Sequence, residues 1–379
     1  MDMREGWEIK KIGEVIEIRN GKNQQAVLSN TGMYKIMGSA GNVMGYATDF
    51  ICEAGTTIIG RKGNISKPIY INERIWNVDT AFGFFPKNEN QIDKRLIYYL
   101  CLGIDFKSMN RGTTIPSLVK SELQMIQINY PKSLIEQQRI IAILDNTFAT
   151  IAQAISNAEQ NLKNAKELFE SYLQGVFENK GEDWEEKTLG EVCTLYQGIA
   201  INAKTKHALI DKSDLPLLRI KDLKNNTVEQ YIDPNNFPKN ALVLEDDIIY
   251  TRTGSLGLVF RGKKGVLHNN SFKVIPNDKL DKDFFFIWLQ NPVFKSKIMQ
   301  LAAKAAQPDI THAIFKIQKI AIPPIKQQQT IVKKLNGLST ETKRLEAIYQ
   351  QKIKTLEELK KSILQKAFNG ELTSQLVLS

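Results

Sequence analysis

The chain has 379 residues, 42% of them hydrophobic and 24% charged, which is enough for two or three domains with proper cores. No run approaches the ~18 apolar residues of a membrane span, and the first residues lack the apolar stretch of a signal peptide. Three cysteines without CxxC spacing disfavour a disulfide or zinc framework. These features predict a cytoplasmic protein without a membrane partner. The net charge of +10 makes nucleic acid a candidate partner.

The opening segment is repeated halfway along the chain. WEIKKIGEV at residues 7–15 returns as WEEKTLGEV at residues 184–192. Later segments recur in the same order, with RKGNI at 61–65 matching RTGSL at 252–256. The sequence therefore contains two copies of a unit of roughly 180 to 190 residues. We predict that the repeated tryptophans, Trp7 and Trp184, are packing anchors and that the repeated glycines, Gly13 and Gly190, form turns.

Each copy begins with about 130 residues of mixed structure. Short alternating apolar runs separated by Gly, Asn and Pro predict strands and turns. An amphipathic stretch in each copy, residues 92–104 and 281–294, predicts a helix. The first part of each copy is therefore expected to be a globular mixed α/β domain, at residues 1–135 and 181–325.

A long helical run follows each globular part, at residues 136–180 and 326–379. Apolar residues alternate at steps of four and three, which is the period of a coiled-coil seam. Paired copies are usually related by a two-fold axis, so the helices are expected to pack antiparallel. The predicted fold is α+β, with two similar globular domains separated by two long helices that form an antiparallel coiled coil. The predicted seams are Leu144, Phe148, Ile151, Ile155, Ala158, Leu162, Ala165, Phe169, Tyr172 and Val176, and Leu335, Leu338, Leu345, Tyr349, Ile353, Leu356, Leu359 and Ile363.

Catalytic motifs are missing from the sequence. It has neither the GxxxxGK[ST] phosphate loop nor a GxGxxG loop after a strand, and its three histidines lie too far apart in sequence for a local metal cluster. NPVF at 291–294 lacks the second proline of the amino-methyltransferase signature, so a helix interrupted by Pro292 is the simpler interpretation. The PD pair at 308–309 has ExK partners only inside the last helical run, where carboxylates would not converge on a metal. We predict that the chain is not an enzyme.

These features together resemble the specificity subunit of type I restriction–modification enzymes. The resemblance rests on the repeated W…GEV…G openings, the R-x-G-x-[IL] hairpins, the Pro…EQQ-R-I…L-D segments that begin the helices and the LQ..F segments that end them. It covers nearly the whole chain. The second copy departs from the pattern, because QQQTIVKKLN at 327–336 has no Glu or Arg where the first copy has Glu136 and Arg139.

The resemblance implies a function without catalysis. Residues 1–135 and 181–325 would be target recognition domains, each reading one half of a bipartite, asymmetric site in double-stranded DNA. The helices would set the spacing and dock two modification (methyltransferase) subunits, to which restriction (nuclease/translocase) subunits add. No cofactor is expected in this chain, and S-adenosylmethionine, ATP and magnesium would belong to the partners.

Candidate DNA-contacting residues are Lys, Arg and small polar side chains on the predicted loops. A solvated surface charge is the alternative for any single lysine, and a structural role within its own hairpin is the alternative for Arg61 and Arg252. In the first copy the candidates are Lys22, Asn23, Arg61, Lys62, Asn64, Lys67, Arg111, Thr113 and Thr114. In the second copy they are Lys204, Lys206, Arg252, Thr253, Ser255, Arg261, Lys263, Lys264, Lys304 and Gln307.

Two other functions stay open from the residues alone. One is a non-catalytic DNA-binding scaffold or antirestriction-type regulator with the same architecture, although a DNA mimic should be acidic and this chain is basic. The other is an enzyme built from duplicated methyltransferase-like domains. Binding of S-adenosylmethionine to the isolated chain would favour that enzyme.

Overall fold

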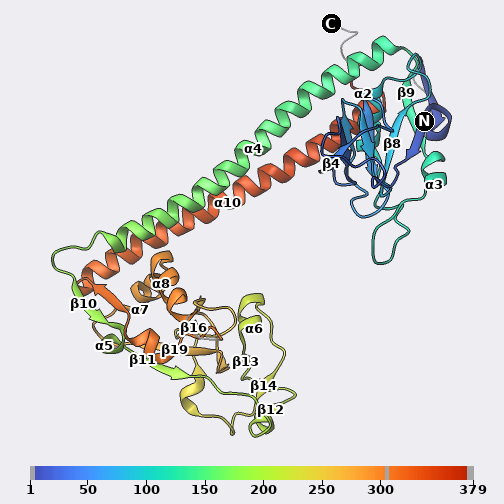
Figure 1. The fold of residues 1–379 in the computed structure, drawn as a ribbon. Helices are drawn as coiled ribbons and strands as arrows, with labels where there is room; N and C mark the ends of the chain where they lie inside the picture. The colour runs from blue at the N-terminus through green and yellow to red at the C-terminus, as the bar shows by residue number, and fades with distance from the viewer. Residues whose placement is uncertain (1–4, 304–306, 374–379) are drawn as a thin grey trace. The chain divides into compact units, whose positions relative to one another are not determined.

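A computed structural model describes residues 5–303 and 307–373 (Figure 1). Residue contacts divide the chain into two units, each of which is described by itself. Unit 1 contains residues 1–159 and 350–379, and unit 2 contains residues 160–349. Each unit therefore combines one globular body with one part of each long helix.

The globular body of unit 1 is built around a four-stranded antiparallel sheet of order β2-β8-β5-β6. A three-stranded sheet of order β4-β3-β7 and the pair β1-β9 complete it. Its elements are β1 (Trp7–Lys11), α1 (Ile12–Val15), β2 (Ile16–Asn20), β3 (Tyr34–Met37), β4 (Val43–Ala47), β5 (Thr56–Gly60), β6 (Ile69–Ile71), β7 (Ile75–Asn77), β8 (Ala81–Pro86), α2 (Lys94–Gly103), α3 (Lys120–Gln124) and β9 (Gln127–Pro131).

The globular body of unit 2 repeats this plan with sheets of order β11-β19-β16-β17 and β13-β18-β15 and the pairs β10-β20 and β12-β14. The helices predicted at 92–104 and 281–294 are confirmed as α2 and α7, and Pro292 begins a separate helix, α8. The elements are β10 (Glu185–Thr188), α5 (Leu189–Val192), β11 (Cys193–Gln197), η1 (Lys206–Ala208), β12 (Leu209–Ile210), β13 (Leu217–Leu218), α6 (Ile220–Asn225), β14 (Tyr231–Ile232), η2 (Lys239–Ala241), β15 (Leu242–Val243), β16 (Ile248–Thr251), β17 (Val259–Phe260), β18 (Gly265–Leu267), β19 (Ser271–Pro276), α7 (Lys282–Trp288), α8 (Pro292–Ala302), α9 (His312–Lys316) and β20 (Lys319–Ile322).

The repeated opening phrase forms the same strand and short helix in both units. Glu14 accepts a hydrogen bond from the Lys11 amide (2.8 Å), and Glu191 accepts one from the Thr188 amide (2.7 Å). Each glutamate thereby satisfies a backbone donor at the start of its helix. Trp7 is buried in the core of unit 1, and Trp184 packs at the edge of the core of unit 2. The prediction that both tryptophans are packing anchors is confirmed.

The prediction that Gly13 and Gly190 form turns is wrong, because both lie within the short helices α1 and α5. A Cβ on Gly13 would lie 2.9 Å from the Cβ of Gln124 in α3, and a Cβ on Gly190 would lie 3.2 Å from the Cβ of Lys316 in α9. The glycines are therefore needed for close helix packing and not for a turn.

The two long helices are α4 (Leu134–Glu178), with 45 residues, and α10 (Ile325–Phe368), with 44. In unit 1 the Lys360 ammonium lies 4.7 Å from the centre of the Phe148 ring. In unit 2 the Lys334 ammonium lies 5.1 Å from the centre of the Tyr172 ring. Figure 1 shows that α4 and α10 run side by side in opposite directions within each unit, which confirms the predicted antiparallel packing.

All ten predicted seam positions of α4 are buried or half-buried. The seam of α10 is less regular than predicted. Leu359 is 46% exposed, and Leu338 and Leu345 are each 37% exposed. Lys360, one residue after Leu359, is the half-buried residue that faces α4. The prediction for Leu359 is wrong because the long apolar stem of a lysine covers a seam position while its ammonium stays near water.

Each globular body takes part of its core from both long helices. The unit 1 core includes Leu144 of α4 and Leu364 of α10. The unit 2 core includes Leu173 of α4 and Leu335 of α10. All three cysteines are buried free thiols. Within residues 5–303 and 307–373, no helix is both long and apolar enough to span a membrane.

Candidate nucleic-acid interface

The segments that carry the candidate residues of unit 1 are held together around one turn, the segment between β7 and β8. The Gly21 amide donates to the Ala81 carbonyl (3.0 Å), and the Lys22 amide donates to the Asn77 carbonyl (2.9 Å). The Arg61 amide donates to the Thr80 carbonyl (2.8 Å). The segment after β2 and the hairpin after β5 are therefore fixed side by side.

A third segment, residues 110–118, joins the same place. The Gly63 amide donates to the Pro116 carbonyl, and the Leu118 amide donates to the Arg61 carbonyl, both at 2.9 Å. The three segments form one end of the four-stranded sheet, which we name edge 1. The candidates on the segments of edge 1 are Lys22, Asn23, Arg61, Lys62, Asn64, Lys67, Arg111, Thr113 and Thr114.

Unit 2 builds an equivalent edge around the turn between β18 and β19. The Ile199 amide donates to the Leu267 carbonyl (2.7 Å), and the Arg252 amide donates to the Asn270 carbonyl (2.9 Å). The Ile310 amide donates to the Arg252 carbonyl (2.9 Å), which is the counterpart of the bond from Leu118 to Arg61. We name this end of the sheet edge 2. The candidates on its segments are Lys204, Lys206, Arg252, Thr253, Ser255 and Gln307.

Three candidates of unit 2 lie away from edge 2. Arg261, Lys263 and Lys264 follow β17, which pairs with β16 through Ile249 and Phe260, so they lie at the end of β16 opposite to Arg252. The Arg261 guanidinium is ion-paired with Asp246 and Asp283, and Lys263 donates to the Asn226 side chain. Lys304 lies outside the described residues.

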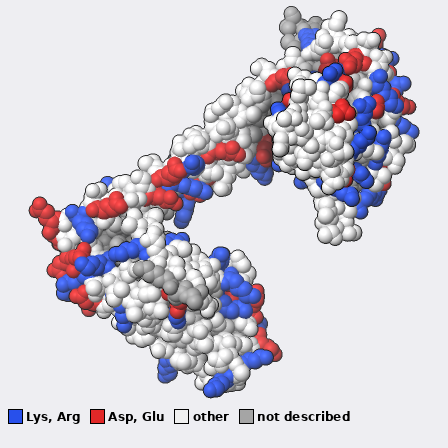
Figure 2. All heavy atoms as spheres, in the orientation of Figure 1, with Lys and Arg blue, Asp and Glu red and all other residues white. Residues whose placement is uncertain are grey.

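The lysines of the two edges differ from the arginines in their partners. Among the described residues, the ammonium groups on these edges have no ion pair or hydrogen bond with the protein. Arg111, in contrast, is paired with Glu122 (3.0 Å). Such unpaired ammonium groups are suited to bind phosphate oxygens. Figure 2 shows that Lys and Arg side chains gather on one side of the globular part of unit 1. The unpaired lysines are Lys22, Lys62, Lys67, Lys204 and Lys206.

The two equivalent arginines, Arg61 and Arg252, have different surroundings. The Nε of Arg252 donates to Oδ1 of Asp309 (2.9 Å), and its Nη2 donates to Oδ2 of the same carboxylate. Ser117 takes the place of Asp309 in unit 1, since each bridges to the residue after the arginine. The Arg61 guanidinium makes one long hydrogen bond, to the Asp79 carbonyl at 3.3 Å. Arg252 is therefore neutralised by a carboxylate, and Arg61 is not.

Two histidines at edge 2 were not among the sequence candidates. Burial lowers the pKa of the His268 imidazole below its ordinary value, and the Arg219 cation lowers it further. Burial also lowers the pKa of His312, with a further contribution from Arg252. Both side chains are therefore neutral at pH 7. The Nδ1 of His268 accepts a hydrogen bond from the Asn270 amide (3.4 Å), and the Nε2 of His312 is buried. Their isolated positions in the sequence gave no motif by which to find them.

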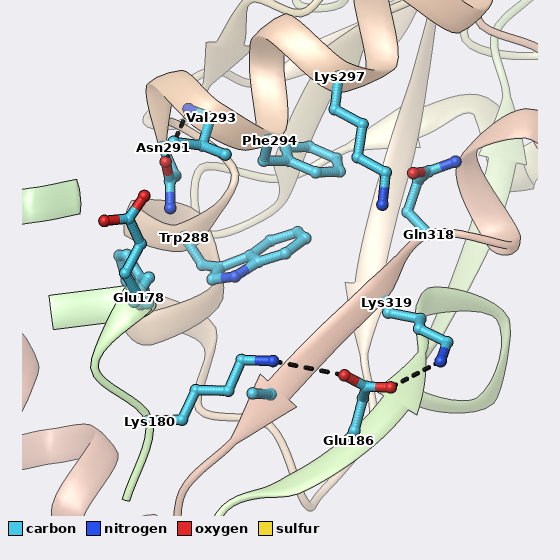
Figure 3. A pocket seen from close by; sticks show the side chains of 12 residues that line it. Glu178, Lys180, Glu186, Trp288, Asn291, Val293, Phe294, Lys297, Gln318 and Lys319 are labelled. Carbon is cyan, nitrogen blue, oxygen red and sulfur yellow. Dashed lines mark hydrogen bonds and ion pairs between the residues drawn. The ribbon is translucent and has the colours of Figure 1, made fainter. Parts of the chain in front are cut away.

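Unit 2 also has a pocket of about 260 Å³ beside Trp288, between the end of α4, the pair β10-β20 and α8 (Figure 3). Glu186 lies between two lysines, 2.7 Å from the Lys319 ammonium and 3.4 Å from that of Lys180. Lys297 reaches toward the pocket from α8. Within the described residues, no group of three or more His, Cys, Asp or Glu side chains could hold a metal ion.

The repeated edges and the two long helices identify the chain as an internally duplicated protein with two globular bodies of one plan. A family model described as the type I restriction modification DNA specificity domain matches residues 4–162 and again residues 181–357. The chain belongs to this family and is a specificity subunit, not an enzyme.

Individual relatives agree with this assignment. The chain is 23% identical to the type I restriction enzyme MjaVIII specificity subunit of Methanocaldococcus jannaschii, over 97% of this chain and 93% of that protein. It is also 23% identical to the EcoBI specificity subunit of Escherichia coli, over 84% of this chain and 74% of that protein. A chain from a solved type I restriction–modification assembly shares the fold, with a TM-score of 0.79, 18% identity and coverage of 98% and 100%.

Proposed function

We propose that edge 1 and edge 2 each read one half of a bipartite, asymmetric site in double-stranded DNA. The observation that carries this proposal is the recurrence of one backbone arrangement in both units: a turn holds two loop segments, and the second of these, the arginine hairpin, holds a third. Residues 1–135 and 181–325 are the proposed target recognition domains, followed by the spacer helices at 136–180 and 326–379. The side chains on the two edges differ, which suits a site with two unlike halves.

The long helices are proposed to set the distance between the half-sites and to dock two modification subunits. Support for docking comes from large apolar side chains outside the seam, such as Ile135 (80% exposed) and Leu168 (73% exposed). Restriction subunits would join through this complex. S-adenosylmethionine, ATP and magnesium would be bound by the partners, and the complex would act on DNA in the cytoplasm.

Exchange of one recognition domain tests the proposal most directly. Replacing residues 1–135 with the matching segment of another specificity subunit should change one half of the methylated sequence and leave the other half unchanged. The measurement is single-molecule methylation mapping in a host that lacks other methyltransferases, with the cognate modification subunits coexpressed. The reciprocal exchange of residues 181–325 is the matched control and should change only the other half. A change in both halves after a single exchange would contradict the proposal.

Arg61 and Arg252 should respond differently to replacement by alanine. Arg61→Ala removes a guanidinium without a carboxylate partner, so DNA affinity should fall by about 10- to 100-fold, the usual loss for an arginine that reads a base. Arg252→Ala should cost less affinity, because Asp309 already occupies that guanidinium. Fluorescence anisotropy of the assembled complex with a labelled duplex measures both. Asp309→Ser, which copies unit 1, should make Arg252 available and raise affinity. Equal losses for the two alanine variants would argue against this difference.

A further inference from the structure

The first turn of each long helix carries a glutamine that is fully buried. Gln137 in α4 and Gln328 in α10 are each 0% exposed. They occupy equivalent positions in the two copies, as the second residue of EQQ and of QQQ. Buried amides need hydrogen-bond partners, so the contacts of these two side chains show what they hold together.

In unit 1 the Gln137 side chain joins α4 to two other segments. Its Nε2 donates to the Pro131 carbonyl at the end of β9 (2.8 Å) and to the Gln91 carbonyl (2.9 Å). Its Oε1 accepts from the Asp93 amide (2.8 Å). Asp93 in turn caps α2, because its carboxylate accepts from the Arg95 amide (2.7 Å).

Unit 2 repeats all of these bonds. Nε2 of Gln328 donates to the carbonyl of Pro323, which directly follows β20 (2.8 Å), and to the Lys279 carbonyl (3.0 Å). Its Oε1 accepts from the Asp281 amide (2.7 Å). Asp281 caps α7 by accepting from the Phe284 amide (2.9 Å). In both copies one glutamine amide thus links the long helix to the strand before it and to the start of α2 or α7. We call these three hydrogen bonds the joint.

Two other residues of the helix starts are not repeated. Glu136 is replaced by Gln327 and Arg139 by Thr330, so the side chains that differ between the copies are not those that form the joint. The joint reaches the recognition edges through the sheet, since α2 contacts β5 and β8, and α7 contacts β19. β8 and β19 begin at the turns on which edge 1 and edge 2 are built.

We propose that Gln137 and Gln328 are positioning residues that hold each edge at a fixed angle to its helix and so restrict the complex to one spacer length. This inference rests on the proposed function. Adding one base pair moves a half-site by about 3.4 Å along the DNA and rotates it by about 35°. A joint held by three hydrogen bonds to backbone groups, one of them buried and two half-buried, resists such a rotation, because tilting the body would leave those groups unpaired.

The test uses variants of similar volume without the amide, Gln137→Met and Gln328→Met, in the full chain coexpressed with its modification subunits. Methylation mapping should give a single bipartite sequence with one spacer for the natural chain. In each variant both half-site sequences should stay the same, while methylation at spacers one base pair longer or shorter rises at least about tenfold. Competition binding with duplexes that differ only in spacer length should show the same loss of discrimination.

The adjacent glutamines supply matched controls. Gln138 and Gln329 are exposed, so Gln138→Met and Gln329→Met should leave the spacer unchanged. If a methionine variant does not fold, Gln137→Glu keeps an acceptor for the Asp93 amide, loses at least one of the two donated bonds and should relax the spacer as well. An unchanged spacer, or an equal loss of methylation at every spacer, would overturn the inference alone. A natural chain without a bipartite sequence would overturn the proposed function and the inference with it.

Discussion

Replacing Gly21 with alanine will destabilise edge 1 by about 3 kcal/mol or more. A Cβ at this position would lie 1.8 Å from the Val78 carbonyl oxygen and 2.6 Å from that of Asn77, far inside van der Waals contact. Backbone atoms cannot turn aside as a flexible side chain can. The turn must therefore shift and break the hydrogen bonds that the Gly21 and Lys22 amides donate to it.

The same result is expected in the second copy, where a Cβ on Gly198 would lie 2.3 Å from the His268 carbonyl oxygen. Hydrogen exchange of the intact chain measures both effects. Gly21→Ala should reduce protection of the Lys22 and Arg61 amides and leave unit 2 unaffected. Gly198→Ala should reduce protection of the Ile199 and Arg252 amides and leave unit 1 unaffected.

Gly63→Ala is the control for these two substitutions. Gly63 has a φ of +80° but no atom within 4 Å of its would-be Cβ, so the cost should be only about 1 kcal/mol. Unchanged protection in the Gly21→Ala variant would show that the turn adapts, contrary to the expectation.

The features that could be predicted from sequence depend on regular patterns. The repeat predicted two bodies of one plan, and the 3.5-residue period predicted the seam of α4, where residues such as Phe148 and Ile151 are buried. The Gly-containing hairpins predicted where Arg61 and Arg252 lie. In each case the pattern follows from local backbone geometry or from the burial of one face.

The features that could not be predicted depend on contacts between distant residues. Nothing in the order of residues paired Arg252 with Asp309, which follows it by 57 positions, or connected Gln137 with Asp93. The prediction that Leu359 lies in the seam is wrong because the apolar stem of Lys360 covers that position of α10. A pattern of apolar residues does not identify a lysine stem as part of a seam. The preference of glycine for turns predicts a turn at Gly13, whereas the close approach of α3 requires a glycine within the helix α1.

Lengthening both long helices by four residues should widen the spacer of the methylated sequence by one or two base pairs. The insertions are placed where the contacts divide the units, after Glu159 in α4 and after Tyr349 in α10. Four helical residues add about 6 Å and a rotation of about 40°. Each base pair adds about 3.4 Å and about 35° of the same hand, so a slightly longer site can satisfy both edges.

Inserting four residues into α4 alone distinguishes this effect from simple flexibility. The Phe148–Lys360 and Tyr172–Lys334 contacts could not then form together, because one helix would be out of step with the other along the seam. That variant should lose methylation, whereas the doubly lengthened chain should retain both half-site sequences at the new spacing. Methylation mapping of the two variants beside the natural chain gives the comparison. An active, doubly lengthened chain with the original spacer would mean that the helices do not determine the spacing.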